Sequence, residues 1–242
     1  MRIAGLDIGT TGCKCTVFDE KGCELGRAYR DYPVRRGTGA HEIDATVLMD
    51  AVYAVIGEMA HKFEKISGIG VTSFGETFVM TDEKGNVLAP AMLYTDPRGA
   101  EECAVLSERL GNNRIARITG ITPHEMYGLP KMMWQKRHNP EIFAKARHIM
   151  QMEDFVVYLL TGNAVIDYSL ATRSMGFDAT QLDGFVEWKM MGVRDYVLGL
   201  ECGNCYPDGR DQMRKSGMLK FLEPNESINY TIRIRLTGYH SC

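Results

Sequence analysis

The sequence contains no long apolar run and no excess of one charge. No stretch approaches the roughly 18 apolar residues that a membrane-spanning helix needs, so we expect no membrane partner. The first residues lack the basic segment and apolar core of a secretory signal. The 28 Lys and Arg nearly balance the 31 Asp and Glu, for a net charge of -3. This balance argues against a nucleic-acid partner.

The cysteines are too few and too scattered for a disulfide framework. There are seven, an odd number, which favours reduced thiols and a cytoplasmic location. Cys202 and Cys205 form a CxxC pair, but a structural zinc ion takes four ligands. The other close pair, Cys13 and Cys15, lies far away in the sequence. We therefore predict no zinc site.

Residues 1–184 alternate short apolar runs with amphipathic periodicities, which is typical of an α/β domain. The 242 residues, 45% apolar and 24% charged, suit one large domain or two small ones. The patterns predict strands at 3–6, 15–18, 24–29, 68–72 and 78–81. They predict helices from the N-cap Asp44 to about 63, and at 98–110, 130–136, from 139–140 onward and at 153–160.

The pattern of apolar and turn residues changes after Gly184. Short runs and turn residues follow, with a strict apolar–polar alternation over 230–236. Such an alternation is typical of a half-buried strand. We therefore predict a boundary near Gly184, with one domain over 1–184 and a β-rich tail over 185–242.

The stretch GLDIGTTGCKCTVFDEKG, residues 5–22, has the composition of a phosphate-binding loop. Gly9, Thr10 and Thr11 are residues whose backbone N–H groups can point inward, and two of them add hydroxyl donors. Lys14 adds a cation, and Asp7 at a strand end can hold Mg²⁺ directly or through water. The loop joins two strands, and the Walker spacing GxxxxGK[ST] is absent. An ordinary hairpin with a tight glycine turn explains the same residues equally well.

Four stretches, in order along the chain, resemble the FGGY family of carbohydrate kinases. They are GLDIGTTGCKCTVFDEKG, IGVTSFGETFVMTDEKGNVLAPAMLYTDPR, ITGITPHEMYGLPKMMWQKRHNPEIFAKARHIMQMEDFVVYLLTG and DYSLATRSMGFD. The resemblance covers residues 1–184. It implies an incomplete ribonuclease H-like domain of the actin-like ATPase fold, the sugar-binding side of such a kinase.

The activity that this resemblance implies is phosphorylation of a sugar or polyol hydroxyl, with Mg-ATP as the cofactor. Asp7, Gly9, Thr10, Thr11 and Lys14 would surround the phosphates, and Asp7 would be the residue that binds Mg²⁺.

The same resemblance implies a substrate site at Glu76, Thr77, Tyr94, Asp96 and Arg98. A carboxylate such as Glu76 can accept bonds from two vicinal hydroxyls; alternatively, it is a salt-bridged strand residue. Tyr94 would form a flat wall for the carbon chain, or belong to the core. Asp96 and Arg98 would contact the sugar, or cap the following helix and pair with each other.

The run ETFVMTD is more similar to glycerol kinases than to xylulokinases. In glycerol kinases an arginine precedes the glutamate and the two bind polyol hydroxyls, whereas Gly75 stands at that position here. Phe74 likewise stands in place of a glutamine. Both replacements remove hydrogen-bond donors and argue against glycerol itself. The nearby HEID at 41–44 has no metal-binding spacing, and we interpret His41 as a surface loop residue.

Two parts of a family kinase are not recognised in the sequence: the aspartate base and a second, nucleotide-binding domain. Asp195, Asp208 and Asp211 lie in contexts unlike that of the base. We therefore expect the chain alone to be inactive as a kinase. The alternative is a non-catalytic fusion or remnant with at most weak sugar or phosphate binding. A partner chain or a second copy that covers the exposed sheet is a further possibility.

Residues 187–236 resemble the C-terminal end of an aldose 1-epimerase-like protein, a β-sandwich of the galactose-mutarotase type. By this match Glu201 would be the base. Its spacing to Pro207 is one residue longer than in mutarotases. The strands and histidines that complete an epimerase site are not recognised here, so we predict no epimerase activity.

Overall fold

A computed structural model describes residues 1–179, 185–191 and 196–202 of the chain. The chain forms two compact units, Met1–Asp178 and Ala179–Cys242. No helix in the described ranges is both long enough and apolar enough to cross a membrane.

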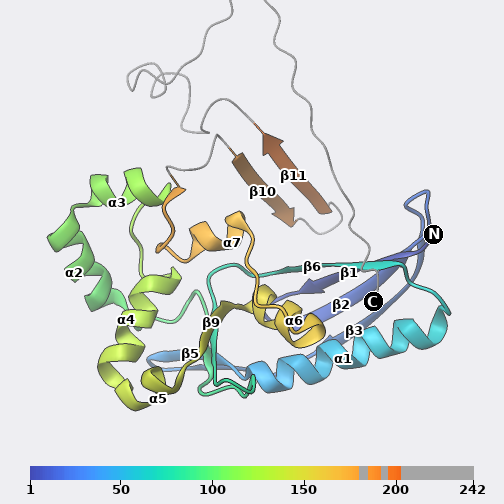
Figure 1. Ribbon diagram of the computed structural model, residues 1–242, viewed down its shortest axis with the longest axis horizontal. Helices are drawn as coiled ribbons and strands as arrows, with labels where there is room; N and C mark the ends of the chain where they lie inside the picture. Colours follow the sequence, from blue (N-terminus) through green and yellow to red (C-terminus); the bar gives the residue numbers. More distant parts are fainter. Residues whose placement is uncertain (180–184, 192–195, 203–242) are drawn as a thin grey trace, which may run out of the picture. The chain divides into compact units, whose positions relative to one another are not determined.

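A four-stranded sheet forms the centre of the first unit (Figure 1). Its strands are β1 (Ile3–Ile8), β2 (Gly12–Phe18), β3 (Glu24–Asp31) and β6 (Gly68–Ser73), in the order β3-β2-β1-β6. β1 runs antiparallel to β2 and parallel to β6. Side chains alternate between the faces of a strand, and Ala4, Leu6 and Ile8 of β1 are buried on one face. Gly5 and Asp7 lie on the other face and are half-buried.

Two DEKG segments form turns that are built in the same way. Asp19 accepts hydrogen bonds from the backbone N–H groups of Lys21 and Cys23, and Gly22 has a φ of 78°. Asp82 accepts from Lys84 and Asn86, and Gly85 has a φ of 83°. An aspartate that bonds its own backbone and a glycine in the left-handed region are the features that such turns need.

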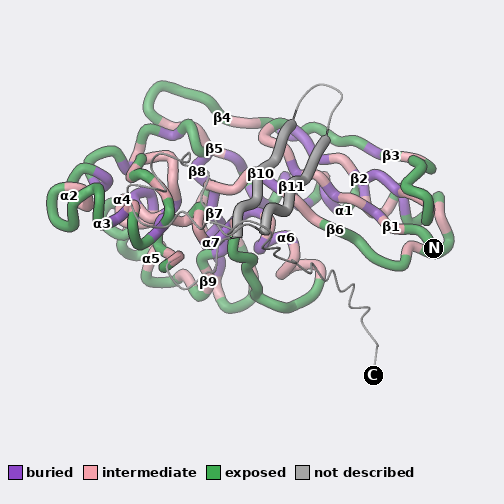
Figure 2. Tube along the Cα trace, turned by 90° about the horizontal axis from the view of Figure 1, so that it is seen from above, coloured by how far each residue is buried: buried purple, intermediate pink, exposed green. Residues whose placement is uncertain are grey.

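Helix α1 (Ala45–Lys62) packs on the apolar face of the sheet. The predicted N-cap is confirmed, because the Asp44 carboxylate accepts from the N–H groups of Thr46 and Val47. Leu48 and Val52 are fully buried and belong to one core cluster with β1 and β2. Figure 2 shows the buried residues gathered along these elements.

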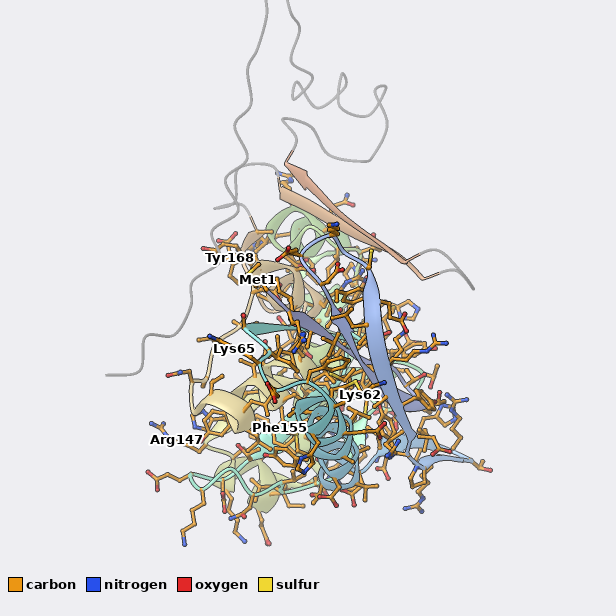
Figure 3. All side chains as sticks on the ribbon, turned by 90° about the vertical axis from the view of Figure 1, so that its right-hand side faces the viewer. Met1, Lys62, Lys65, Arg147, Phe155 and Tyr168 are labelled. Atoms are coloured by element: carbon orange, nitrogen blue, oxygen red, sulfur yellow. The ribbon has the colours of Figure 1, made fainter. Side chains whose placement is uncertain are left out.

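Small sheets and helices extend the first unit. β4 (Val34–Gly37), β5 (Ala40–Ile43) and β8 (Ala91–Met92) form one sheet, and β7 (Phe78–Thr81) pairs antiparallel with β9 (His148–Gln151). Helix α6 (Met152–Thr161) follows β9 and ends at Gly162, where φ is 75°. Its Phe155 is 1% exposed and lies in the interior, whereas Arg147 extends outward at the periphery (Figure 3).

The remaining helices are α2 (Ala100–Leu110), α3 (Asn112–Thr119), α4 (Gly128–His138), α5 (Pro140–Lys145) and α7 (Tyr168–Arg173). Helix α3 was not predicted: Gly111 ends α2 and at once begins α3. Asn139 precedes α5 as predicted, but its side chain makes no capping bond and donates to Gln135 instead.

The interpretation of His41 as a surface loop residue is wrong about the loop, and its side chain is half-buried. His41 lies in β5, a strand that the sequence did not reveal. Its Nδ1 is 2.9 Å from the Thr95 hydroxyl, and its backbone N–H donates to Asp96. The pairing of β5 with β8 places this segment in a sheet, and no local pattern signals that pairing.

The second unit contains one described hairpin, in which β10 (Phe185–Met191) and β11 (Tyr196–Cys202) run antiparallel. The strand predicted at 230–236 lies outside the described residues.

The inner face of α1 gives a stability prediction. Leu48 is fully buried, whereas its neighbour Val47 is 38% exposed. Leu48→Ala is expected to lower the free energy of unfolding by about 2–5 kcal/mol, because it leaves a cavity. Val47→Ala should change it by about 0.5 kcal/mol or less. Urea unfolding followed by circular dichroism measures both, and equal losses would contradict the assigned inner face.

Candidate functional site

Asp7 stands between two polar neighbours near the end of β1. Asp7 pairs with Lys14 on β2 on one side and with Thr72 on β6 on the other. Residues directly opposite each other share a face, so all three lie on the face away from α1. Lys14 Nζ is 3.6 Å from Asp7 Oδ2. The carboxyl ends of parallel strands are where ligands bind α/β sheets, and here an acid, a cation and a hydroxyl meet at such an end.

The loop between β1 and β2 is held in place by Tyr32. Gly9 N donates to the Gly12 carbonyl at 2.9 Å, which closes the loop. The Tyr32 phenol donates to the Gly9 carbonyl, and the Tyr32 N–H donates to the Thr11 carbonyl at 3.2 Å. Burial raises the pKa of the Tyr32 phenol, so the phenol keeps its proton.

These bonds engage the Gly9 N–H and the carbonyl groups of Gly9, Thr11 and Gly12, and they leave the donors of Thr10 and Thr11 available. Within the described part of the chain, the N–H and hydroxyl groups of Thr10 and Thr11 donate to no protein acceptor. Donors that face outward from a turn are the element that binds phosphate oxygens in other loops.

The presence of glycine at position 12 also has a purely structural explanation. A Cβ at this position would lie 2.2 Å from Tyr29 Oη and 2.8 Å from the Arg30 carbonyl oxygen, both on β3. Glycine is therefore required for β3 to approach. The plain hairpin explains Gly12, and it leaves the Thr10 and Thr11 donors in the loop between β1 and β2, where solvent or a ligand can accept from them.

The Asp7 carboxylate near the loop suits a metal ion that binds together with a phosphate ligand. In the ranges that the structure describes, no three His, Cys, Asp or Glu residues come together as a metal site. Mg²⁺ keeps several waters and binds through one or two carboxylates together with phosphate oxygens. Asp7 therefore fits a hydrated Mg²⁺ bound to phosphates, and does not form a resident metal centre.

Asp96 and Arg98 form a second polar cluster, centred on a two-point ion pair. Arg98 Nε donates to Asp96 Oδ1 at 2.8 Å, and Nη2 donates to Asp96 Oδ2 at 2.6 Å and to Glu42 Oε1 at 2.7 Å. Burial raises the pKa of Asp96, but the hydrogen bonds from Arg98 and His41 outweigh it and hold the pKa below its usual value. The guanidinium also lies over Trp134, 5.0 Å from the ring centroid.

This geometry settles the pairing and capping roles considered for the two residues, whereas the sugar contact stays a prediction. Asp96 and Arg98 do bind each other, but they do not cap α2, because its N-cap is Gly99 and has no side-chain bond. Asp96 is only 1% exposed. Both residues therefore stiffen the segment that carries Tyr94.

The other predicted substrate residues differ in accessibility. Tyr94 is 39% exposed, which argues against the alternative that it belongs to the core. Glu76 Oε1 lies 3.2 Å from Arg173 Nη1. Thr77 is fully buried, and its hydroxyl finds no partner among the described residues. Tyr94 is therefore accessible, the Glu76 side chain is 13% exposed, and Thr77 is enclosed.

Lys131 is a fully buried cation that joins the segments of this second cluster. Its Nζ donates to the Leu93 carbonyl at 2.6 Å and to the Met126 carbonyl at 3.1 Å. Burial lowers the pKa of Lys131 to about 8, although the charges of Asp96 and Glu76 oppose this shift. The ammonium therefore lies within electrostatic reach of both acids.

Glu76 lies four residues after Thr72, which connects the polar group at Asp7 with the predicted substrate residues. Thr72 lies beside Asp7, and Glu76 follows it after the end of β6. Four extended residues span at most about 14 Å. The Ser73 N–H donates to Glu153 Oε2 at 3.1 Å, which fixes the start of this connection against α6.

Thr72, Lys131 and Arg173 were missed from the sequence. Thr72 could have been found only by pairing β6 with β1 in register. Lys131 and Arg173 carry no local signal, because the shorter of the two Lys131 bonds reaches a carbonyl 38 residues away and Arg173 pairs with an acid 97 residues away. Glu201 lies in β11 opposite Val186, and its side chain is outside the described structure, so its role stays a prediction.

Comparisons with known proteins give two family matches. A model of the FGGY family of carbohydrate kinases, N-terminal domain, matches residues 2–190. A model of a domain of unknown function, DUF4432, matches residues 162–236. The two matches overlap, so the boundary predicted near Gly184 and the epimerase-like tail stay predictions.

Three relatives illustrate the similarity. A xylulose kinase of Staphylococcus xylosus is 29% identical over 182 residues, 72% of this chain and 37% of the relative. A glycerol kinase of Thermococcus onnurineus is 29% identical over 206 residues, 81% of this chain and 42% of the relative. The crystal structure of a xylulose kinase from Rhodospirillum rubrum has a TM-score of 0.71 at 26% identity, covering 74% of this chain and 38% of that one.

Lys131 gives a pH prediction for stability. Its folded pKa of about 8 lies below the ordinary value of 10.5. Between these values the unfolded chain holds a proton that the folded chain has lost, so the Lys131 contribution to stability rises with pH. Relative to Lys131→Met, the native chain should gain up to about 1.4 kcal/mol per pH unit in this window.

Urea unfolding of both proteins at pH 7, 8.5 and 10 measures this difference. A difference in unfolding free energy that stays constant with pH would contradict the lowered pKa of Lys131.

Proposed function

The chain belongs to the FGGY family of carbohydrate kinases, and we propose that it carries the part of such a kinase that holds the sugar and the nucleotide phosphates. The predicted ribonuclease H-like fold is confirmed by the solved kinase structures that it matches. The chain spans about 37% of the length of the xylulose kinases that it resembles. The proposed reaction is transfer of the γ-phosphoryl group of ATP to a sugar or polyol hydroxyl.

The phosphate side of the proposal is supported by the unused donors of the loop. The N–H and hydroxyl groups of Thr10 and Thr11 would bind phosphate oxygens, and Gly9 lets the backbone turn there. Lys14 would offset negative charge. Asp7 would hold a hydrated Mg²⁺, which when bound neutralises charge on the transferred group. The loop donors beside Asp7 are the observation that carries the proposal.

The sugar side of the proposal uses the second cluster. The Glu76 carboxylate would accept hydrogen bonds from sugar hydroxyls, and the exposed ring of Tyr94 would pack along the carbon chain. Thr77, Asp96 and Arg98 would act from behind, by holding these two residues in place. Relatives named as xylulose, gluconate and glycerol kinases share 25–29% identity with this chain, which leaves the sugar open.

In the proposed reaction the acceptor hydroxyl oxygen bonds to the γ-phosphorus, and the bond from that phosphorus to the bridging oxygen of ADP breaks. The hydroxyl proton passes to a base. The positions of Thr72 and Glu76 on one connection would place the acceptor beside the phosphates.

A second candidate function is binding of sugar or phosphate without turnover. The observation in its favour is that the chain spans about 37% of the length of the xylulose kinases it resembles. The partner chain or second copy considered above stays a prediction under both candidates.

An ATP-turnover assay with Mg²⁺ separates the two candidates. Xylulose, fructose, glycerol and erythritol serve as acceptors, with Asp7→Ala as the test variant and Asp50→Ala, at an exposed position on α1, as the matched control. For a kinase we expect acceptor-dependent turnover that falls about 100-fold or more in Asp7→Ala, because charge on the transferred group loses its metal.

Turnover of equal size in Asp7→Ala and Asp50→Ala would contradict the role given to Asp7. Sugar or Mg-ATP binding in calorimetry, without turnover in any variant, would establish the second candidate instead.

A further inference from the structure

We propose that Arg173 is a specificity-determining residue of the sugar site, where its guanidinium and the Glu76 carboxylate together bind two neighbouring hydroxyls. This inference rests on the proposed function, because it requires that a sugar or polyol binds at Glu76.

The pair is assembled from distant parts of the sequence. Arg173 is the last residue of α7, and its Nη1 lies 3.2 Å from Glu76 Oε1. The Arg173 side chain is 46% exposed and that of Glu76 13%. A cation that is open to solvent thus stands beside an acid that is mostly covered.

Most of the bonding capacity of the pair is unused. Within the described residues, this ion pair is the contact that the structure gives to either charged group. A guanidinium has five N–H donors, and a carboxylate has about four acceptor positions. Donors and acceptors of both kinds therefore remain at one solvent-facing spot.

Gly75 makes room for the arginine. A Cβ on Gly75 would lie 3.2 Å from Arg173 Cγ and 3.5 Å from Leu170 Cδ2. The stem of Arg173 therefore packs over the backbone just before Glu76. A side chain at position 75 would require the Arg173 stem to shift, and we expect this shift to disturb the approach of the guanidinium to Glu76.

The base of the pair is rigid and charged. Lys131, fully buried, lies within electrostatic reach of Glu76. The Thr77 carbonyl accepts the Met152 N–H at 3.0 Å, which ties the residue after Glu76 to α6. The backbone beside Glu76 is thus anchored to α6, and Arg173 is the more exposed member of the pair.

The donors of Arg173 and the acceptors of Glu76 suit a ligand with two neighbouring hydroxyls. Each sugar hydroxyl both donates and accepts a hydrogen bond, so one can donate to Glu76 while its neighbour accepts from Arg173. A site that binds a hydroxyl in this way rejects an analogue that lacks it, because the site then keeps unpaired polar groups. Arg173 would therefore select for a hydroxyl at one defined carbon.

The test is a calorimetric titration of the full chain with xylulose, fructose, glycerol and erythritol, and with deoxy analogues of whichever binds. Arg173→Met is the test variant, and Arg109→Met, at an exposed arginine of α2, is the matched control. We expect Arg173→Met to weaken sugar binding about 10- to 150-fold, and to lose the discrimination against one deoxy analogue. Mg-ATP affinity and the melting temperature should stay unchanged.

Gly75→Ala keeps the proposal testable independently of the arginine. It should weaken sugar binding in the native background and have no further effect in Arg173→Met, because the tightest contact of the added Cβ is with the Arg173 stem. Additive losses in the double variant would overturn the proposal.

The remaining outcomes separate this inference from the proposed function. If the native chain binds a sugar and Arg173→Met binds it equally well, the role of Arg173 is wrong and the sugar site stands. If the native chain binds Mg-ATP but none of the sugars, the sugar side of the proposed function fails, and the inference fails with it.

Discussion

The parallel pairing of β1 with β6 is the constraint on which both polar clusters depend. Strand β1 lies between an antiparallel neighbour and a parallel one, and the register sets Asp7 between Lys14 and Thr72. The same register places Thr72, near the end of β6, beside Asp7. Glu76 follows Thr72 by four residues in the sequence. A shift of one residue would turn Asp7 toward α1 and bring an apolar side chain to the open face.

Buried charge organises the second cluster. Asp96 accepts from Arg98 and from the backbone of β5, and Lys131 donates to the carbonyl of Leu93. Each buried ion needs its partners, because an unpaired charge in the interior is costly. The segment from 93 to 98 is therefore held at several points, and Tyr94 projects from a rigid base. Glu76 and Arg173 lie where this base meets the end of β6.

Structural features that depend on interactions between nearby residues could be predicted from the sequence. The N-cap Asp44, both DEKG turns and the apolar stripe of α1 depend on neighbours a few residues apart, and all are present. The resemblance to carbohydrate kinases identified the family. Local patterns could not reveal β5, the contact of His41 with Thr95, or the contact between Arg173 and Glu76, because long-range packing creates them.

The most direct test of the central claim, that the loop after β1 binds phosphate, is an amide NMR titration of the full chain with Mg-ATP. The account predicts that the Thr10 and Thr11 amide signals shift first and furthest, since no protein acceptor engages them within the described residues. The same signals should not respond to Mg²⁺ alone in Asp7→Ala. Saturable binding that leaves the Thr10 and Thr11 signals unmoved would contradict the account.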